Sequence, residues 1–569
     1  MSEVIASLTL LLVVIWPLLL AGAVSSGTTR PVPMRLVPWA ALPALVTAVV
    51  LPEIGLQLHG TMLGGELVLD GTGRVFLLLS ATLWLATGLL ARPQLHTSGA
   101  NRFAVLLLLA MAGGFGLALA GDAMLFFAAG TLAGYALYGL LVHDANISLQ
   151  TAVRVLVVLL VLSDLLVFEL LLILGQAAGS VDFMSLRQAW MNTDYRGVVL
   201  GLLIVGFGIK AGVVGVHFWL APVFVNAGMA VRPALVSFML GAGLLGWLRL
   251  LPIGDIHWSG AGVVLQWLAW FTLGYAVLAG QLKAHPRAVQ ACTAIALTGL
   301  WVAMLGAVLL HPQPWSGMAE AAHATILQSG FALAALLLLD RRTAGNIPKW
   351  LHPLPHAVKW LAALQLATVP VAVTVFLSKD DGFATVQMSW TTAAIAFLVV
   401  RSLLLSQPAS HGSLDMKTTP DGVQQPMQAP TATAHLVAGG LTAAGLLAAA
   451  YNLVELSPIN FGLPVLMMMA ASLAAWLSVK RRVPHLPDLP LLVPISNGLA
   501  AALRRGRRLA DRRLQLWRDA GRAQVERLWS RMGWGRVIGR FESRLNHWPT
   551  TLVILAALGL FMATLVAIG

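Results

Sequence analysis

Long apolar segments alternate with short polar connections along most of the chain. Hydropathy predicts about sixteen such segments, each near the roughly 20 residues with which a helix crosses the hydrocarbon of a bilayer. They lie near residues 4–24, 36–56, 72–91, 103–121, 122–142, 152–177, 197–220, 228–251, 261–282, 288–310, 319–339, 355–377, 388–406, 432–454, 461–479 and 549–568. Strand-length segments of alternating polarity, typical of outer-membrane barrels, are absent. The pattern therefore predicts an all-α polytopic membrane protein.

Two longer polar segments interrupt this pattern. Residues 407–431 are rich in Ser, Thr, Pro and Gln and predict a flexible loop. Residues 480–547 begin with spaced prolines and continue with a run of arginines, and apolar residues recur near helical spacing over 497–532. We expect a basic amphipathic arm there. It either rests on anionic lipid headgroups or forms a strut along a neighbouring subunit, and basic charge alone does not separate the two.

The composition agrees with a chain embedded in a membrane. Hydrophobic residues make up 58% of the 569 residues and charged residues 10%, whereas soluble domains carry about 25% charged residues. The net charge of +13 indicates cytoplasmic loops rather than nucleic-acid binding, because basic residues gather in the connections after odd-numbered spans. We expect a multi-pass protein of the inner membrane with both termini on the periplasmic side. We interpret segment 4–24 as a retained helix rather than a signal peptide.

The sequence contains few signs of cofactor chemistry. Cys292 is the only cysteine, which argues against an intramolecular disulfide, Cys-ligated zinc and an iron–sulfur cluster. No Walker A loop, nucleotide fingerprint or haem attachment motif occurs, so we expect no cofactor and no catalytic site in this chain. For a membrane enzyme, the only candidates at one interface are His352, His356 and Lys359.

A few ionisable residues lie inside or at the end of predicted spans, where charge is costly and is therefore a candidate for function. They are Asp164, Glu169, Lys210, His217, His323 and Lys379. Asp164 and Glu169 are separated by about 140° around a helix, so they cannot face one partner together. We expect Asp164, in mid-span, to pair with Lys210. The alternative is a purely structural ion pair.

Lys210 and His217 stand in a glycine-rich segment. On a continuous helix their spacing corresponds to two turns, which places both side chains on one face about 10 Å apart. That distance suits a proton step bridged by water. The glycines, from Gly206 to Gly215, also permit local unwinding of the kind found at the broken helices of transporters. The alternative is that these glycines serve only close helix packing. For Lys379, the alternative to a functional role is a lysine that snorkels from a helix end to the membrane surface.

Two motifs resemble those of the antiporter-like membrane subunits. Residues Lys210, His217, Trp219 and Leu220 match the family's Lys-x6-His-x-Trp-Leu segment in its seventh helix, and Phe376, Ser378, Lys379 and Asp380 match its Phe-x-Ser-Lys-Asp/Glu segment in the twelfth. The family includes the distal membrane subunit of complex I, the Mrp antiporter subunits, membrane subunits of group 4 hydrogenases and the membrane partner of Dab-type inorganic-carbon complexes. The resemblance covers residues 70–405.

The resemblance implies a domain organisation. N-terminal helices occupy 1–102, and two inverted five-helix repeats occupy 103–251 and 252–406. After the polar loop 407–431 come C-terminal helices in 432–479, the arm in 480–547 as a lateral helix, and a last span in 548–569. It also implies other membrane or peripheral subunits in a hetero-oligomeric complex.

The resemblance implies roles for the ionisable residues as well. Lys210 would be the central proton carrier, Asp164 its modulating carboxylate and His217 a relay. Lys379 would be the group at which protons enter or leave, and His323 a bridge between the two halves. Glu169 completes the set of candidate pathway residues.

The sequence departs from the family at two charged positions. Ala128 stands where family members have a glutamate in the fifth helix, and Ala332 stands near their central lysine in the eleventh. The resemblance therefore implies a divergent proton-conducting subunit, either of a translocase like NADH–quinone oxidoreductase or hydrogenase, or of a Dab-type complex that uses the proton gradient for inorganic-carbon uptake. A non-conducting subunit that only anchors a partner is the remaining alternative. The sequence specifies neither the coupling ion, H⁺ or Na⁺, nor the direction of transport.

Overall fold

The computed structural model describes most of the chain up to residue 475. It describes residues 3–26, 31–58, 65–97, 99–143, 147–190, 192–253, 258–310, 315–339, 353–377, 382–406, 432–454 and 469–475. All of them belong to one compact unit, Met1–Val483. The polar loop 407–431, the basic arm 480–547 and the last span 548–569 lie outside the described residues.

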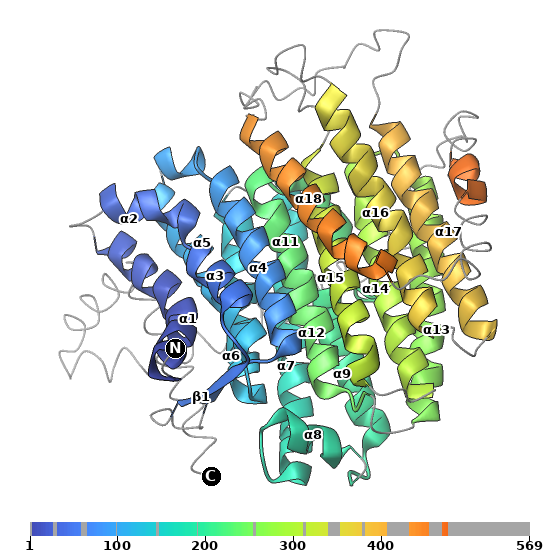
Figure 1. Cartoon of the computed structure of the whole chain (residues 1–569), viewed down its shortest axis with the longest axis horizontal. Coiled ribbons are helices and arrows are strands. Elements are labelled where there is room, and N and C mark those ends of the chain that lie inside the picture. The colour runs from blue at the N-terminus through green and yellow to red at the C-terminus, as the bar shows by residue number, and fades with distance from the viewer. Residues whose placement is uncertain are drawn as a thin grey trace, which may run out of the picture. The chain divides into compact units, whose positions relative to one another are not determined.

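Helices account for nearly all of the described residues (Figure 1). By length and composition, nine helices within the described residues are suited to cross a membrane. They are Ala6–Ser25, Val32–Val50, Gly71–Leu90, Ala100–Leu119, Ala123–His143, Ala152–Ala178, Met229–Leu250, Ser259–Leu282 and Pro286–Leu310. The other predicted spans are shorter, broken, partly described or outside the described residues, so the total of about sixteen stays a prediction.

The N-terminal region contains the one exception to the predicted all-α fold in the described part of the chain. Helix α1 (Glu3–Ser25) is followed by α2 (Pro31–Leu36), the 3₁₀ turn η1 (Val37–Trp39) and α3 (Leu42–Val50). An antiparallel hairpin of β1 (Ile54–Leu58) and β2 (Gly65–Leu69) comes next, with Ile54 opposite Leu69. The predicted span 36–56 is therefore wrong at its end. Ile54-Gly-Leu-Gln-Leu58 alternates in polarity, the period of a strand, over a length too short to show in hydropathy.

The hairpin is joined to the turn between the next two long helices, α5 (Ala100–Leu119) and α6 (Ala123–His143). The backbone N–H of Glu66 donates to the Asp122 carboxylate at 2.8 Å, and the same side chain accepts from Leu125 N–H at the start of α6. The closely spaced pair of spans predicted near residue 121 is thereby confirmed. Helix α4 (Gly71–Leu90) and the 3₁₀ turn η2 (Gln94–His96) precede this pair.

The middle of the chain contains broken helices. Helix α7 (Ile147–Ala178) leads through the short α8 (Phe183–Ala189) to α9 (Arg196–Ala211) and α10 (Leu220–Asn226). The predicted span 228–251 consists of the 3₁₀ turn η3 (Met229–Val231), α11 (Arg232–Phe238), the π-helix η4 (Met239–Leu244) and α12 (Leu245–Leu250). Single-turn π segments inside α-helices are frequent at functional sites.

The second half is a set of long helices. They are α13 (Ser259–Leu282), α14 (Pro286–Leu310), α15 (Trp315–Leu338), α16 (Pro353–Leu377), α17 (Gly382–Leu405) and α18 (Ala432–Val454). Helix α14 packs against α13 and α17, α16 packs against α17, and α15 packs against α18 (Figure 1). The two inverted repeats expected over 103–251 and 252–406 stay a prediction.

Three buried or half-buried arginines cap carbonyl ends of helices in this bundle. Arg401 donates to the carbonyls of Gly280 and Gln281 at the end of α13, at 3.1 and 2.6 Å. Arg232 donates to Leu337 O at the end of α15, and Arg187 to Leu248 O at the end of α12. The last carbonyls of a helix have no partner inside it and carry partial negative charge. These cations therefore stabilise helix ends.

Candidate functional site: a broken helix with a buried ion pair

Helix α9 stops at Ala211 because the chain reverses its backbone handedness at Gly212. Gly212 has φ of 81°, a left-handed conformation that glycine adopts without steric cost. The N–H groups of Gly212 and Val213 both donate to Gly208 O, at 2.8 and 2.9 Å, which ends the helix as a left-handed glycine cap does. The prediction of local unwinding is confirmed. The estimate that Lys210 and His217 lie two turns apart on one helical face is wrong, because residues between Ala211 and Leu220 are not helical.

The carbonyls left open by the break are satisfied from outside the helix. The indole N–H of Trp219 donates to Ile209 O at 2.8 Å, and the Thr298 hydroxyl of α14 donates to Ala211 O at 2.8 Å. A broken helix inside a membrane survives only where its backbone groups find such partners. These hydrogen bonds stabilise the break, and the one from Thr298 also joins the end of α9 to α14.

Lys210 occupies the last turn of α9 and forms a buried ion pair. Its Nζ donates to Asp164 Oδ1 of α7 at 2.8 Å, and the two side chains are only 4% and 11% exposed. The negative end of the helix dipole also favours a cation at this position. The predicted pairing of Lys210 with Asp164 is confirmed, whereas Glu169 lies exposed on another side of α7.

Helix α6 contributes a tyrosine and a glycine to the ion pair. The Tyr135 hydroxyl lies within hydrogen-bonding reach of the Asp164 carboxylate. A Cβ at Gly130 would lie 3.8 Å from Lys210 Nζ, so Gly130 is the α6 residue beside the lysine. Ala128 is exposed, because two residues along a helix differ by about 200°. Position 128, where family members have a glutamate, therefore does not face Lys210 in this chain.

His217 is buried beyond the break, among aromatic rings. It is 4% exposed, and its ring centroid lies 4.3 Å from that of Tyr275 in α13 and 4.9 Å from that of Phe218. Nδ1 has no hydrogen-bond partner among the described residues. One ring nitrogen is therefore available to exchange a proton, the basic requirement of a relay.

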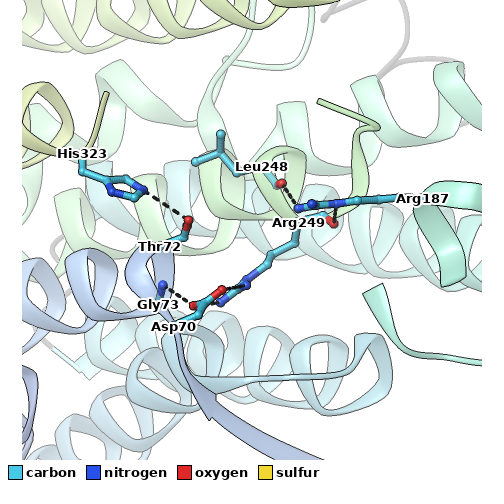
Figure 2. Close-up of polar contacts among 7 residues, drawn as sticks. All are labelled: Asp70, Thr72, Gly73, Arg187, Leu248, Arg249 and His323. Carbon is cyan, nitrogen blue, oxygen red and sulfur yellow. Dashed lines mark hydrogen bonds and ion pairs between the residues drawn. The ribbon is translucent and has the colours of Figure 1, made fainter. Parts of the chain in front are cut away.

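His323, on α15, contacts the start of α4 and lies away from the level of Ala332. Figure 2 shows its ring directed at Thr72, with 3.2 Å between Nε2 and the hydroxyl oxygen. Ala332 is fully buried and lies further along α15 by roughly 14 Å at 1.5 Å per residue. His323 therefore does not occupy the level of Ala332 and belongs to a separate polar group.

That separate group is centred on a salt bridge between α4 and α12. Arg249 donates to both carboxylate oxygens of Asp70, at 2.5 and 2.8 Å, and Gly73 N–H donates to Asp70 Oδ1 at 2.7 Å (Figure 2). Burial raises the pKa of Asp70, but the hydrogen bonds and charge of Arg249 outweigh it, so the pKa lies below its ordinary value. Asp70 also caps the N-terminus of α4.

A neutral hydrogen-bonded set, which sequence reasoning missed, lies near Ala332. Gln328 Nε2 donates to Gln365 O at 2.9 Å and to the Thr368 hydroxyl at 3.0 Å. Gln365 Nε2 in turn donates to Thr442 O of α18 at 2.8 Å. The available signal was the presence of amides inside apolar spans, which is costly unless they are paired.

The remaining candidates do not gather into a site. Lys379 lies outside the described residues, as do the side chains of His352 and His356. Lys359 hydrogen-bonds the Ser406 hydroxyl. Among the described residues, no group of three or more His, Cys, Asp or Glu side chains is placed to hold a metal ion.

Comparison with known proteins agrees with this arrangement. Residues 120–405, which contain the broken helix, match the family described as NADH:quinone oxidoreductase/Mrp antiporter, transmembrane region. The chain belongs to this family. An uncharacterised protein of Mycobacterium tuberculosis is 30% identical over 183 residues, 31% of this chain and 28% of that protein. Hydrogenase-4 component B of Escherichia coli is 25% identical over 235 residues, 41% of this chain and 32% of that protein. The matched segment thus spans less than a third of each of these two relatives.

Solved structures show the same fold over most of the chain. A chain of the membrane-bound sulfane sulfur reductase, an archaeal respiratory membrane complex, superposes with a TM-score of 0.61 at 14% identity and covers 96% of this chain and 99% of its own length. A chain of the Mrp complex from Dietzia sp. DQ12-45-1b superposes with a TM-score of 0.59 at 20% identity, covering 84% and 98%. These superpositions show that the chain shares its fold with one chain of each of these two membrane complexes.

Proposed function

We propose that this chain is a proton-conducting membrane subunit whose conduction passes through the buried ion pair at the break in α9. The observation that carries the proposal is the contact of Lys210 with Asp164 at 2.8 Å in the interior of the bundle. A buried ion pair contributes little net stability over apolar side chains of similar size. Its presence at an unwound helix end, where transporters hold their ions, favours a functional role.

The geometry around the break supports the following proposed roles. Lys210 carries the proton, and Asp164 sets how firmly the lysine keeps it, with Tyr135 as a hydrogen-bonding neighbour. His217, beyond the break, hands the proton on through its open Nδ1. Lys379 remains the proposed group at which protons enter or leave.

Beyond His217 the proposed path uses neutral groups in place of the missing central lysine. The amides of Gln328 and Gln365 and the hydroxyl of Thr368 both donate and accept hydrogen bonds. Gln328 lies on α15, one turn before Ala332, and Gln365 and Thr368 lie on the neighbouring α16. In this proposal the polar groups hold water molecules along which the proton passes, because amide N–H groups bonded to backbone carbonyls do not themselves relay a proton.

A non-conducting anchor is the second candidate. It is favoured by Ala332, which is fully buried among apolar residues where other family members have a lysine. In that case the ion pair is a structural remnant and proton movement does not depend on Lys210. The resemblance to respiratory and hydrogenase complexes favours a redox partner; the Dab-type alternative rests only on the departures at positions 128 and 332.

The test is proton entry into vesicles that contain the purified complex. A potassium diffusion potential drives protons inward, and a trapped pH-sensitive dye reports their arrival, so the natural substrate of the partner is not needed. Lys210→Gln should abolish the dye response, and Lys210→Arg should retain part of it. An unchanged response in Lys210→Gln, with the complex intact on a native gel, would establish the anchor instead. Measuring ²²Na⁺ uptake into the same vesicles shows whether the chain conducts Na⁺ instead of H⁺.

A further inference from the structure

Glu169 lies on an outward face of α7, in the apolar stretch of that helix. The helix contains the span Ala152–Ala178, whose best window has a mean hydropathy of 2.8. Glu169 is exposed, and no other described residue gives its carboxylate a hydrogen bond or an ion pair. A carboxylate on the outside of a membrane-spanning helix is unusual, because charged groups in spans almost always face protein or water.

The depth of Glu169 prevents it from reaching the membrane surface. Ala178, the last residue of α7, lies further along the helix by roughly 14 Å, and a glutamate side chain is much shorter than that. Headgroup contact, which long Lys and Arg side chains achieve by snorkelling, is therefore closed to it. The carboxylate therefore meets hydrocarbon or a protein segment outside the described residues.

The exposed face that carries Glu169 has the spacing of a helix–helix contact. The stripe consists of Val155, Val158, Leu162, Leu165, Glu169 and Leu172, separated alternately by three and four residues. Its apolar members are between 42% and 66% exposed. This alternation is the heptad pattern by which two helices pack side by side with knobs in holes, and a single polar residue within it sets the register of the pair.

The other side of α7 is already occupied. It packs against α6, α9 and α10, and it provides Asp164 to Lys210 and the Ser163 hydroxyl to Gly206 O at 2.7 Å. The stripe is therefore a second, independent face of the same helix.

We propose that this stripe binds a transmembrane helix of another subunit, and that this helix presents a lysine or arginine at the depth of Glu169. Charge complementarity decides the occupant, because a carboxylate held away from water is favourable only beside a cation or strong donor. A second copy of this chain packed through the same face would place Glu169 against Glu169, two like charges. The interface lies outside the proton path and does not rest on the proposed function.

Cross-linking in native membranes tests the contact. A photo-reactive phenylalanine analogue replaces Leu165 in the full chain within its complex, and Phe271 at the middle of α13 serves as the control. The two positions are equally exposed, at 63% and 65%. The Leu165 probe should cross-link to another polypeptide through a membrane segment that contains a lysine or arginine. Cross-links only to lipid, to a segment without a basic residue, or back to this chain would overturn the proposal.

Substitution of the carboxylate gives an independent result. Glu169→Leu should lower recovery of the assembled complex by about tenfold, because it leaves the partner's cation unpaired in the membrane, and Glu169→Asp should retain assembly. Phe271→Leu is the matched control and should change nothing. If Glu169 faced lipid, Glu169→Leu would leave recovery unchanged or raise it. Size-exclusion chromatography of each purified variant chain in detergent distinguishes lost assembly from misfolding, because a misfolded chain does not elute at the wild-type volume.

Discussion

At the residue scale, one contact of Lys210 at the end of α9 was predictable from the sequence and its other neighbours were not. The partner of Lys210 was predictable, because Asp164 and Glu169 point in directions about 140° apart and only one can face inward. Tyr135 and Gly130 were not predictable as neighbours, because the face that α6 turns toward α9 depends on the packing of three helices. An offset of two residues, from Ala128 to Gly130, exchanges an exposed position for one beside the lysine.

Replacing one or both members of the ion pair measures how much the pair contributes to the free energy of unfolding. Asp164→Leu leaves Lys210 as an unpaired buried cation and should lower the free energy of unfolding by about 3–5 kcal/mol. Adding Lys210→Met should restore the free energy of unfolding to near the wild-type value, because no unpaired charge is then buried. Thermal unfolding of the purified chain in detergent measures both variants. A double variant as unstable as the single one would mean that the ion pair itself stabilises the fold.

The Asp70–Arg249 contact gives a pH dependence. The pKa of Asp70 lies below its ordinary value of 3.8, so the contact stabilises the folded chain at pH values above about 4 and this contribution is lost as the pH falls. The unfolding temperature of Asp70→Asn should therefore lie below that of the wild type at neutral pH, and the difference should shrink below about pH 4. A difference that stayed constant down to pH 3 would show that the carboxylate charge is unimportant.

At the element scale, the sequence indicated that α9 could unwind but not where the chain would turn. The choice of Gly212 as the left-handed residue depends on Trp219 and Thr298, which satisfy the last carbonyls of α9 from elsewhere. The π-helix η4 packs against the end of α9, and a Cβ at Gly243 would meet the backbone nitrogen of Ala211 at 2.7 Å. Such close contacts arise from tertiary structure, so hydropathy alone predicted one continuous span.

Gly201 in α9 and Gly212 directly after it should respond in opposite directions to replacement by alanine. Gly212→Ala forces a side chain into a left-handed conformation and should cost about 1–2 kcal/mol in unfolding free energy. Gly201→Ala lies in the helix with nothing within 4 Å of the new Cβ and should stabilise the chain by about 0.5–1 kcal/mol. Thermal unfolding in detergent compares the two directly. Equal effects would contradict the assignment of Gly212 as the break point.

At the scale of the whole molecule, the family fold was predictable because two motifs in the right order fix the positions of the seventh and twelfth helices. The small hairpin was missed because its strands are short and their stability comes from the turn between α5 and α6, where Asp122 accepts the Glu66 N–H. The arm over 497–532 and the orientation of the termini stay predictions. Glu169 adds a partner-facing surface, which is invisible in sequence until the opposite face of α7 is known to be filled.

If protons cross this chain through the pair of Lys210 and Asp164, removing both charges at once must slow them. The double substitution Lys210→Met and Asp164→Leu should leave fold and assembly intact, and proton entry is measured in vesicles that carry the complex with this variant. The rate should fall by about a hundredfold or more, as expected when a positioned proton-transfer group is removed. Proton entry at the wild-type rate through the assembled double variant would show that protons do not pass through this pair.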